Sequence, residues 1–199
     1  MSGWLHGFAG RQPGLDAVLR FLAARAVFAF PLLLIALYFA PHPHRRRRRR
    51  VAIRAGAAAM LGWGISGLIG ALADRPRPFV AEPGRVRPLL PRPPDPAFPS
   101  DHATIALAVV VGLWELGPAW RWPLGVLAGL VGLARVAVGA HWPTDVIGGG
   151  TLGALVGSGL RALSPRLDPA LDRLLDGLGP LGRDAPDAAC TAGRRGLRP

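Results

Sequence analysis

The chain has 199 residues, of which 24 are basic, 12 are acidic and 50% are hydrophobic, and its net charge is +12 at neutral pH. The apolar residues come in long blocks, which excludes an intrinsically disordered chain and is not typical of a soluble enzyme. Every basic residue is arginine, which excludes Schiff-base lysine chemistry, and a single cysteine, Cys190, excludes an internal disulfide.

Five long apolar segments predict an all-α fold, a polytopic bundle of membrane helices. In chain order they cover residues 21–40, 51–73, 103–117, 123–140 and 144–164. At 1.5 Å per residue the second reaches about 34 Å, which is enough to cross the hydrocarbon core of a bilayer. We expect five transmembrane helices, or six if residues 1–20 form another. The N-terminus lacks the basic region and cleavage site of a secretory signal.

A composition change predicts a membrane-embedded domain at 1–164 and a cytoplasmic tail at 165–199. Leucines recur in the tail with helical spacing, at positions 171, 174, 175 and 178. Asp168-Pro169 has the chemistry of a helix start, so we expect a short amphipathic helix on the inner leaflet to begin there. Beyond Pro180 the sequence predicts disorder.

The distribution of arginine orients the protein in the membrane. Six consecutive arginines, Arg45–Arg50, separate the first two apolar segments, and residues 161–199 carry seven more. These regions therefore belong to the cytoplasm, which places 74–102 and 139–144 on the outer face of a multi-pass protein of the cell membrane. We also expect Arg45–Arg50 to contact anionic membrane lipids. Nucleic-acid binding is not expected, because the run is a single patch without interleaved aromatics.

Three polar segments fall at the outer ends of the apolar ones, where ionisable groups are costly and usually functional. They are DRPRPF at 74–79, FPSDHA at 98–103 and ARVAVGAHWPTD at 134–145. Arg77 and Arg135 offer planar guanidinium groups suited to phosphate oxygens. Ser100 and Thr144 predict N-caps of helices whose free N–H groups would face an anion. The sequence therefore predicts a phosphate site on the outer face.

Two histidines in these segments suggest catalysis. His141 lies four residues before Asp145, so we expect the carboxylate to bond one imidazole nitrogen, fix the tautomer and leave the other nitrogen as a nucleophile. His102 is placed to protonate a leaving oxygen. The alternative is a cation such as zinc, held by the two histidines with Asp101 and Asp145. The nearby arginines would repel a cation, so we expect no metal and no cofactor.

The last apolar segment carries a stripe of small residues, Gly149, Gly153 and Gly157, at a spacing of four. Such a stripe lets two helices approach closely. We expect it to hold Asp145 near the third and fourth apolar segments. The sequence assigns no role to Gly148 and Gly150.

The three polar segments resemble the motifs of the type 2 phosphatidic acid phosphatase superfamily, which are Lys-x6-Arg-Pro, Pro-Ser-Gly-His and Ser-Arg-x5-His-x3-Asp. The matching positions here are Arg77-Pro78, then Pro99-Ser100-Asp101-His102, then Arg135, His141 and Asp145. The resemblance covers roughly residues 60–160. It implies that His141 attacks phosphorus to form a phosphohistidine, that Asp145 orients His141, and that His102 protonates the leaving group. It also implies that Arg77, Arg135 and Ser100 hold the phosphoryl oxygens.

The chain departs from the family pattern at three positions. The motif lysine falls at Gly70, for which Arg75 is a substitute only by proximity. The serine before Arg135 is Ala134, which removes a hydroxyl. The glycine of the second motif is Asp101, as in the bacterial undecaprenyl-diphosphatase branch associated with bacitracin resistance. Asp101 is expected either to position water or tune His102, or to have a static structural role.

The resulting functional hypothesis is a membrane phosphatase that hydrolyses a lipid diphosphate, undecaprenyl diphosphate first of all. The alternative is the same chemistry on a lipid monophosphate such as phosphatidic acid or phosphatidylglycerophosphate. A third hypothesis is a lipid-binding or transport protein that kept the fold after losing the lysine. No protein partner can be named from the sequence.

Overall fold

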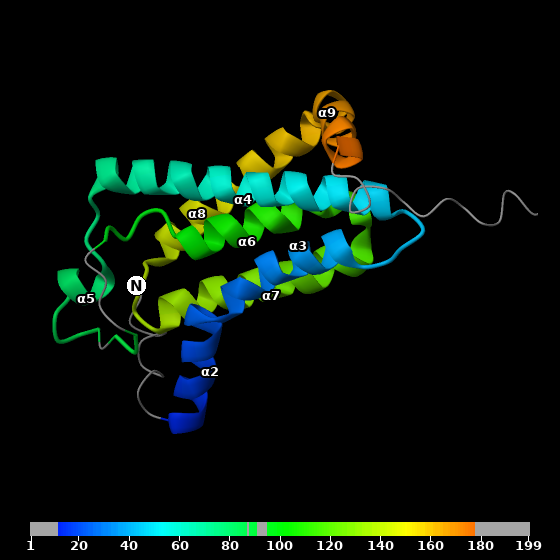
Figure 1. Ribbon diagram of the computed structural model, residues 1–199. Coiled ribbons are helices and arrows are strands. Elements are labelled where there is room, and N and C mark those ends of the chain that lie inside the picture. The colour runs from blue at the N-terminus through cyan, green and yellow to red at the C-terminus, as the bar shows by residue number, and fades with distance from the viewer. Residues whose placement is uncertain (1–11, 87, 91–94, 178–199) are drawn as a thin grey trace, which may run out of the picture.

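The computed structural model describes residues 12–86, 88–90 and 95–177, and all regular elements in this part of the chain are helices (Figure 1). The helices are α2 (Pro13–Ala24), η1 (Ala26–Phe28), α3 (Ala29–Phe39), α4 (Arg45–Ala73), α5 (Pro78–Ala81), α6 (Asp101–Gly112), η2 (Trp114–Leu116), α7 (Pro118–Ala137), α8 (Pro143–Ala162) and α9 (Ser164–Gly177). The predicted all-α fold is confirmed. The expected disorder beyond Pro180 lies outside the described residues.

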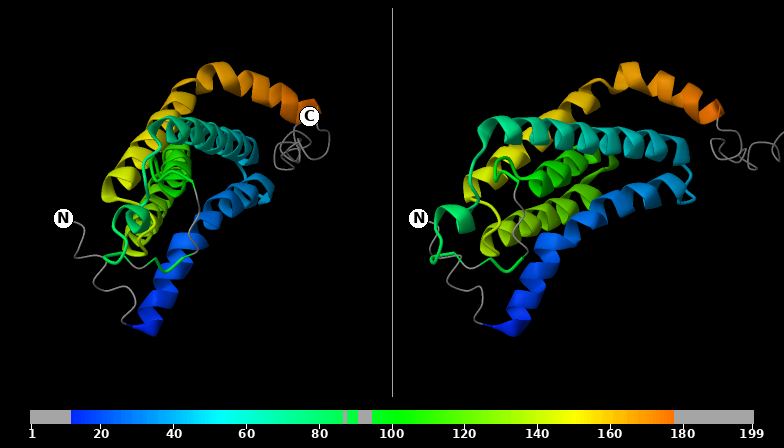
Figure 2. Two further views of the ribbon diagram at one scale, coloured as in Figure 1. Left: turned by 90° about the vertical axis from the view of Figure 1, so that its left-hand side faces the viewer. Right: turned by 60° about the vertical axis from the view of Figure 1, so that its left-hand side comes forward.

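Helix α6 is the centre of the bundle and packs against α4, α7 and α8 (Figures 1 and 2). Small and β-branched residues surround its axis, and Ala106, Ala108 and Val109 are almost completely buried. A helix that is apolar on all sides is stable only when other helices cover it. This central position puts the first turn of α6 among the ends of its neighbours.

The membrane spans differ from those expected. Among the described residues, one stretch, Arg45–Ala81, which comprises α4 and α5, is long and apolar enough to cross a bilayer alone. Two bent pairs, α2 with α3 and α8 with α9, meet the same criterion only if each pair is one span. Helix α6 has 12 residues, or about 18 Å, which is shorter than the hydrocarbon core. The expected count of five spans is therefore not confirmed.

Two element boundaries correct the sequence analysis. Helix α4 starts at Arg45 and not at residue 51, because arginine is a good helix former and the six arginines extend the apolar helix by almost two turns. Helix α2 starts at Pro13 and bends by 43° into the next helical segment. Its Ala23 packs with Ala134 and Val138 at the end of α7.

The glycine stripe brings α8 against α6. A Cβ atom at Gly153 would collide with the backbone oxygen of Thr104, and one at Gly149 would collide with that of Ser100. The expected close approach is thus present between α8 and the helix of the second polar segment. Gly148, which had no assigned role, makes room for the ring of Phe98.

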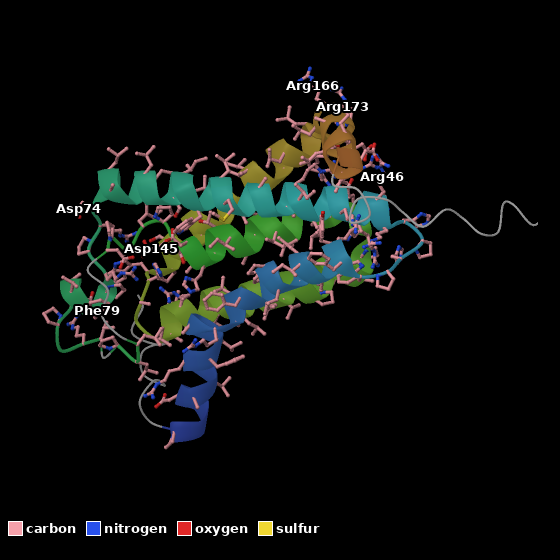
Figure 3. All side chains as sticks on the ribbon, in the orientation of Figure 1. Arg46, Asp74, Phe79, Asp145, Arg166 and Arg173 are labelled. Carbon is pink, nitrogen blue, oxygen red and sulfur yellow. The ribbon has the colours of Figure 1, made fainter. Side chains whose placement is uncertain are left out.

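Helix α9 docks on α4 through a ladder of ion pairs at the end of the bundle that carries Arg46 (Figure 3). Arg46, Arg50 and Arg54 of α4 pair with Asp168, Asp172 and Asp176 of α9, and Arg54 also pairs with Glu115. Two arginines of the run that was expected to contact lipid, Arg46 and Arg50, are therefore bound to carboxylates. Asp168 and Pro169 lie inside α9 and not at its start, because the helix already begins at Ser164.

Candidate active site

The three polar segments meet in one cavity of about 450 Å³. It lies at the end of the bundle that carries Asp145, opposite the end that carries Arg46 (Figure 3). The polar residues that line it are Ser66, Arg77, Asp95, Asp101, His102, Arg135 and His141. They come from α4, the segment before α5, the segment before α6, α6 itself, α7 and the turn between α7 and α8.

His141 is buried and has two different nitrogen environments. Its Nδ1 lies 2.7 Å from the carbonyl oxygen of Ala97 and 3.8 Å from Oδ2 of Asp145. A carbonyl only accepts hydrogen bonds, so Nδ1 carries the proton and donates it, and Nε2 keeps a lone pair. The expected tautomer is present, but the hydrogen-bond acceptor that fixes it is Ala97 and not Asp145.

Two guanidinium groups face the lone pair of His141. Nη2 of Arg135 lies 2.9 Å from Nε2, and Nη1 of Arg77 lies 3.4 Å from it. Arg135 also donates to the carbonyl oxygen of Ala23, and Arg77 to that of Ala140. An anion that accepts from both guanidinium groups would therefore lie beside Nε2 of His141.

Burial lowers the pKa of His141 below its ordinary value of 6.5, and the positive charges of Arg135 and Arg77 lower it further. The carboxylate of Asp145 and the carbonyl of Ala97 oppose this shift without reversing it. His141 is therefore neutral near pH 7, which is the state that a nucleophile requires.

Asp145 is completely buried and its carboxylate accepts hydrogen bonds from two donors. Its Oδ2 accepts from the backbone N–H of Trp142 at 2.7 Å, and its Oδ1 accepts from Arg75 at 2.6 Å. The same guanidinium nitrogen of Arg75 donates to the hydroxyl of Thr144. Trp142, and not Thr144, is the N-cap of α8. Arg75 thus fixes the start of α8 and is absent from the cavity wall.

Ser100 and Asp101 begin α6 in different environments. Ser100 is the N-cap residue, as expected, but its Oγ is buried and makes no hydrogen bond to any described residue. Its backbone N–H donates to the carbonyl of Asp145 at 3.0 Å, which ties α6 to α8. Asp101 lines the cavity, and its Oδ1 accepts a 2.6 Å hydrogen bond from Ser66 of α4. His102 follows on the wall of the same cavity.

The position of the motif lysine is on the cavity wall. Gly70 lines the cavity, and a Cβ atom added there would lie 3.3 Å from the carbonyl oxygen of Phe98. A longer side chain at this position would require the segment of Phe98 to move. A Cβ atom at position 70 is thus a tight fit that needs the carbonyl of Phe98 to shift by a few tenths of an ångström.

Sequence reasoning missed three groups of the site. Asp95 binds Arg77 through its carboxylate at 2.6 Å and through its carbonyl at 3.0 Å. Ser66 and the carbonyl of Ala97 were also missed. The repeated prolines around Asp95 and Ala97 were the available signal, since they fix the backbone of a segment that has no helix to support it.

The described residues include no cluster of three or more histidine, cysteine, aspartate or glutamate side chains that could hold a metal ion. The guanidinium groups of Arg77 and Arg135 lie 3.4 Å and 2.9 Å from Nε2 of His141. The cavity is therefore built around fixed positive charge, which favours an anionic ligand.

Comparisons with known proteins agree with this geometry. A family model described as the PAP2 superfamily matches residues 50–168. The undecaprenyl-diphosphatase BcrC of Bacillus subtilis (strain 168) is 32% identical over 168 residues, which cover 84% of each chain. The crystal structure of LpxE from Aquifex aeolicus has a TM-score of 0.67 at 23% identity, over 81% of this chain and 92% of that one. A transmembrane PAP2 type phosphatidylglycerolphosphate phosphatase from Bacillus subtilis has a TM-score of 0.62 at 23% identity, over 83% of each chain.

Proposed function

The chain belongs to the PAP2 superfamily, and on this premise we propose that it is an integral membrane phosphatase that hydrolyses a polyprenyl diphosphate, with undecaprenyl diphosphate as the leading candidate. The observation that carries the proposal is the lone pair of His141 Nε2 facing Arg77 and Arg135 in one cavity. The substrate comes from the name of the Bacillus subtilis relative, an undecaprenyl-diphosphatase. The transmembrane PAP2 structure with the same fold supports a membrane location.

In the proposed reaction, the terminal phosphoryl group displaces the arginines from His141 and accepts their hydrogen bonds. Nε2 then attacks phosphorus, and the bond between phosphorus and the bridging oxygen breaks. The leaving group is the polyprenyl monophosphate, whose new oxygen takes a proton from His102. The two guanidinium groups stabilise the charge that builds up on the phosphoryl oxygens.

Hydrolysis of the phosphohistidine completes the cycle. Neutral His102 accepts a proton from water, the water oxygen attacks phosphorus, and the bond from phosphorus to Nε2 breaks. Inorganic phosphate leaves, and the lone pair returns to His141. Each turnover thus consumes one water and regenerates both histidines. The carboxylate of Asp145, 3.8 Å from Nδ1, offsets the positive charge that the imidazole carries in the intermediate.

The remaining residues have supporting roles in this proposal. Arg75 positions Asp145 and the start of α8, and Ser100 links α6 to α8, so neither needs to contact phosphate. Asp101, bonded to Ser66, borders the cavity where the second phosphate of a diphosphate would extend. The two guanidinium groups supply the positive charge that a metal ion supplies in other phosphatases, so we propose that the reaction needs no metal.

The test is phosphate release by the purified protein, with a chelator present, from undecaprenyl diphosphate and phosphatidic acid in parallel. His141→Ala should abolish release, and His102→Ala or Arg135→Ala should lower kcat by about 10²–10³-fold. His44→Ala, at the opposite end of the bundle, is the control and should keep full activity. A preference for phosphatidic acid would replace the proposed substrate, and activity that survives His141→Ala would refute the mechanism.

A further inference from the structure

A second cavity lies beside the site, on the outside of the bundle between α3, α4 and α6. It has a volume of about 490 Å³, and every residue that lines it is apolar. Ile35, Met60 and Trp63 form its rim and are each about half exposed or more. Ala59 and Val109 form its floor and are buried. We call this cavity the apolar groove.

The apolar groove continues the catalytic cavity along two helices at once. On α4, Trp63 lines the groove, and Ser66 and Gly67 line the catalytic cavity one turn further. On α6, His102 lines the catalytic cavity and Ile105 lines the groove three residues later. Side chains three or four residues apart share a helix face and are separated by about 5 Å along the axis. Along both helices, the residues that line the cavities therefore change from polar to apolar within a single turn.

We propose that the apolar groove binds the first isoprene units of the substrate, so that one hydrocarbon chain enters it directly from the phosphate. The inference rests on the proposed function. The cavity on the other side of Arg77 and Arg135 has a volume of only about 40 Å³, little more than the space of one water. The groove offers the larger apolar path away from His141.

The chemistry of the groove selects among lipids. A polyprenyl chain is hydrocarbon from the first carbon after the phosphate oxygen. A glycerophospholipid instead carries two ester groups within a few bonds of its phosphate, and among the side chains that line the groove only the indole N–H of Trp63, at the rim, could donate to their carbonyl oxygens. Burying unpaired polar groups is unfavourable. The groove thus favours a single prenyl chain over a diacylglycerol.

Two glycines of α4 allow a matched test. Gly56 lines the groove, and a Cβ atom there would meet the side chain of Leu34 at an ordinary 3.7 Å. Gly64 lies on the same helix, is exposed and has no atom within 4 Å of an added Cβ. Gly56→Leu should fill the groove and raise the KM for undecaprenyl diphosphate about tenfold. The Ki of inorganic pyrophosphate, which has no chain, should stay within about twofold, and Gly64→Leu should change neither constant.

An equal rise of KM and Ki in Gly56→Leu, or an unchanged KM, would overturn the proposal. A second measurement uses the unmodified protein and a prenyl diphosphate with a photoreactive group near the start of its chain. Crosslinks should map to Met60 or Trp63 and be displaced by undecaprenyl diphosphate but not by phosphatidic acid. Crosslinks elsewhere would show that the prenyl chain lies outside the groove. Crosslinks that no competitor displaces would show that bulk lipid fills the groove. Either result would overturn the proposal. Absence of phosphate release by the unmodified protein would refute the function separately.

Discussion

At the scale of single residues, the site depends on which atoms contact the two ring nitrogens of His141. The spacing of His141 and Asp145 predicted that Asp145 bonds one ring nitrogen, but Nδ1 of His141 donates to the carbonyl oxygen of Ala97, 44 positions earlier in the chain. A backbone carbonyl is present at every residue, so no sequence pattern marks the one that faces an imidazole. The motif side chains could be predicted from the sequence, but Asp95, Ser66 and the backbone contacts that orient the site could not.

The lowered pKa of His141 predicts the acidic limb of the pH profile. The neutral imidazole is the nucleophile, so kcat/KM should stay high as the pH falls through 6.5 and should decline only below it. The same shift makes folding less stable below pH 6.5, because the unfolded chain then binds the proton more readily than the folded one. The measurement is kcat/KM against pH, and an acidic limb at or above 6.5 would contradict the prediction.

The ion pair between Asp95 and Arg77 predicts that Asp95 competes with the phosphoryl group of the substrate for Arg77. Its carboxylate occupies Arg77 at 2.6 Å, and its side chain is 55% exposed. A phosphoryl group must replace it to bind both arginines. Asp95→Asn should therefore lower KM about two- to fivefold and leave kcat nearly unchanged, since a half-exposed ion pair is worth little. Steady-state kinetics and inhibition by inorganic phosphate measure the effect. A higher KM would mean that Asp95 holds Arg77 in place for the substrate.

At the scale of helices, close contact between α6 and α8 aligns the second and third polar segments. The spacing of Gly149, Gly153 and Gly157 predicted this contact correctly. The sequence was less informative about span lengths, because Ala- and Gly-rich segments look equally apolar whether protein or lipid surrounds them. Helix α6 shows this, since its 12 residues are enclosed by other helices.

Gly153 and Gly159 of α8 allow this packing to be measured. A Cβ at Gly153 would collide with the backbone of α6, and one at Gly159 has no atom within 4 Å. Gly153→Ala should lower the free energy of unfolding by about 1–3 kcal/mol and reduce activity. Gly159→Ala should be neutral or stabilising by up to about 1 kcal/mol. Unfolding in detergent measures both changes, and equal effects of the two substitutions would contradict the packing role.

At the scale of the whole molecule, the two ends of the bundle carry different groups of charged side chains. The catalytic cavity lies at the end that carries Asp145, and the arginine ladder lies at the end that carries Arg46 (Figure 3). Arginine excess marks the cytoplasmic side, so the cavity is proposed to face outward. The sequence predicts this orientation from charge alone. It does not predict that part of the charge is neutralised by α9, because the ion partners are far apart in sequence.

Labelling of single cysteines tests the proposed orientation. With Cys190 replaced by serine, Asp74→Cys introduces a thiol at the exposed end of α4, and His44→Cys introduces one beside the arginine run. A membrane-impermeant maleimide should label Asp74→Cys in intact cells and His44→Cys only after permeabilisation. The reverse result would place the cavity in the cytoplasm.

The ion pairs between α4 and α9 also imply an order of events during synthesis of the chain. Arg46 and its partner Asp172 are 126 residues apart, so a ribosome adding about 5–20 residues per second makes the arginines roughly 6–25 s before the aspartate. During that interval no carboxylate of α9 neutralises the arginines, which is when they are proposed to hold their end of the first helices in the cytoplasm. Synthesis of α9 then supplies the carboxylates that pair with these arginines, so the charge proposed to orient the first helices becomes a stable contact between α4 and α9.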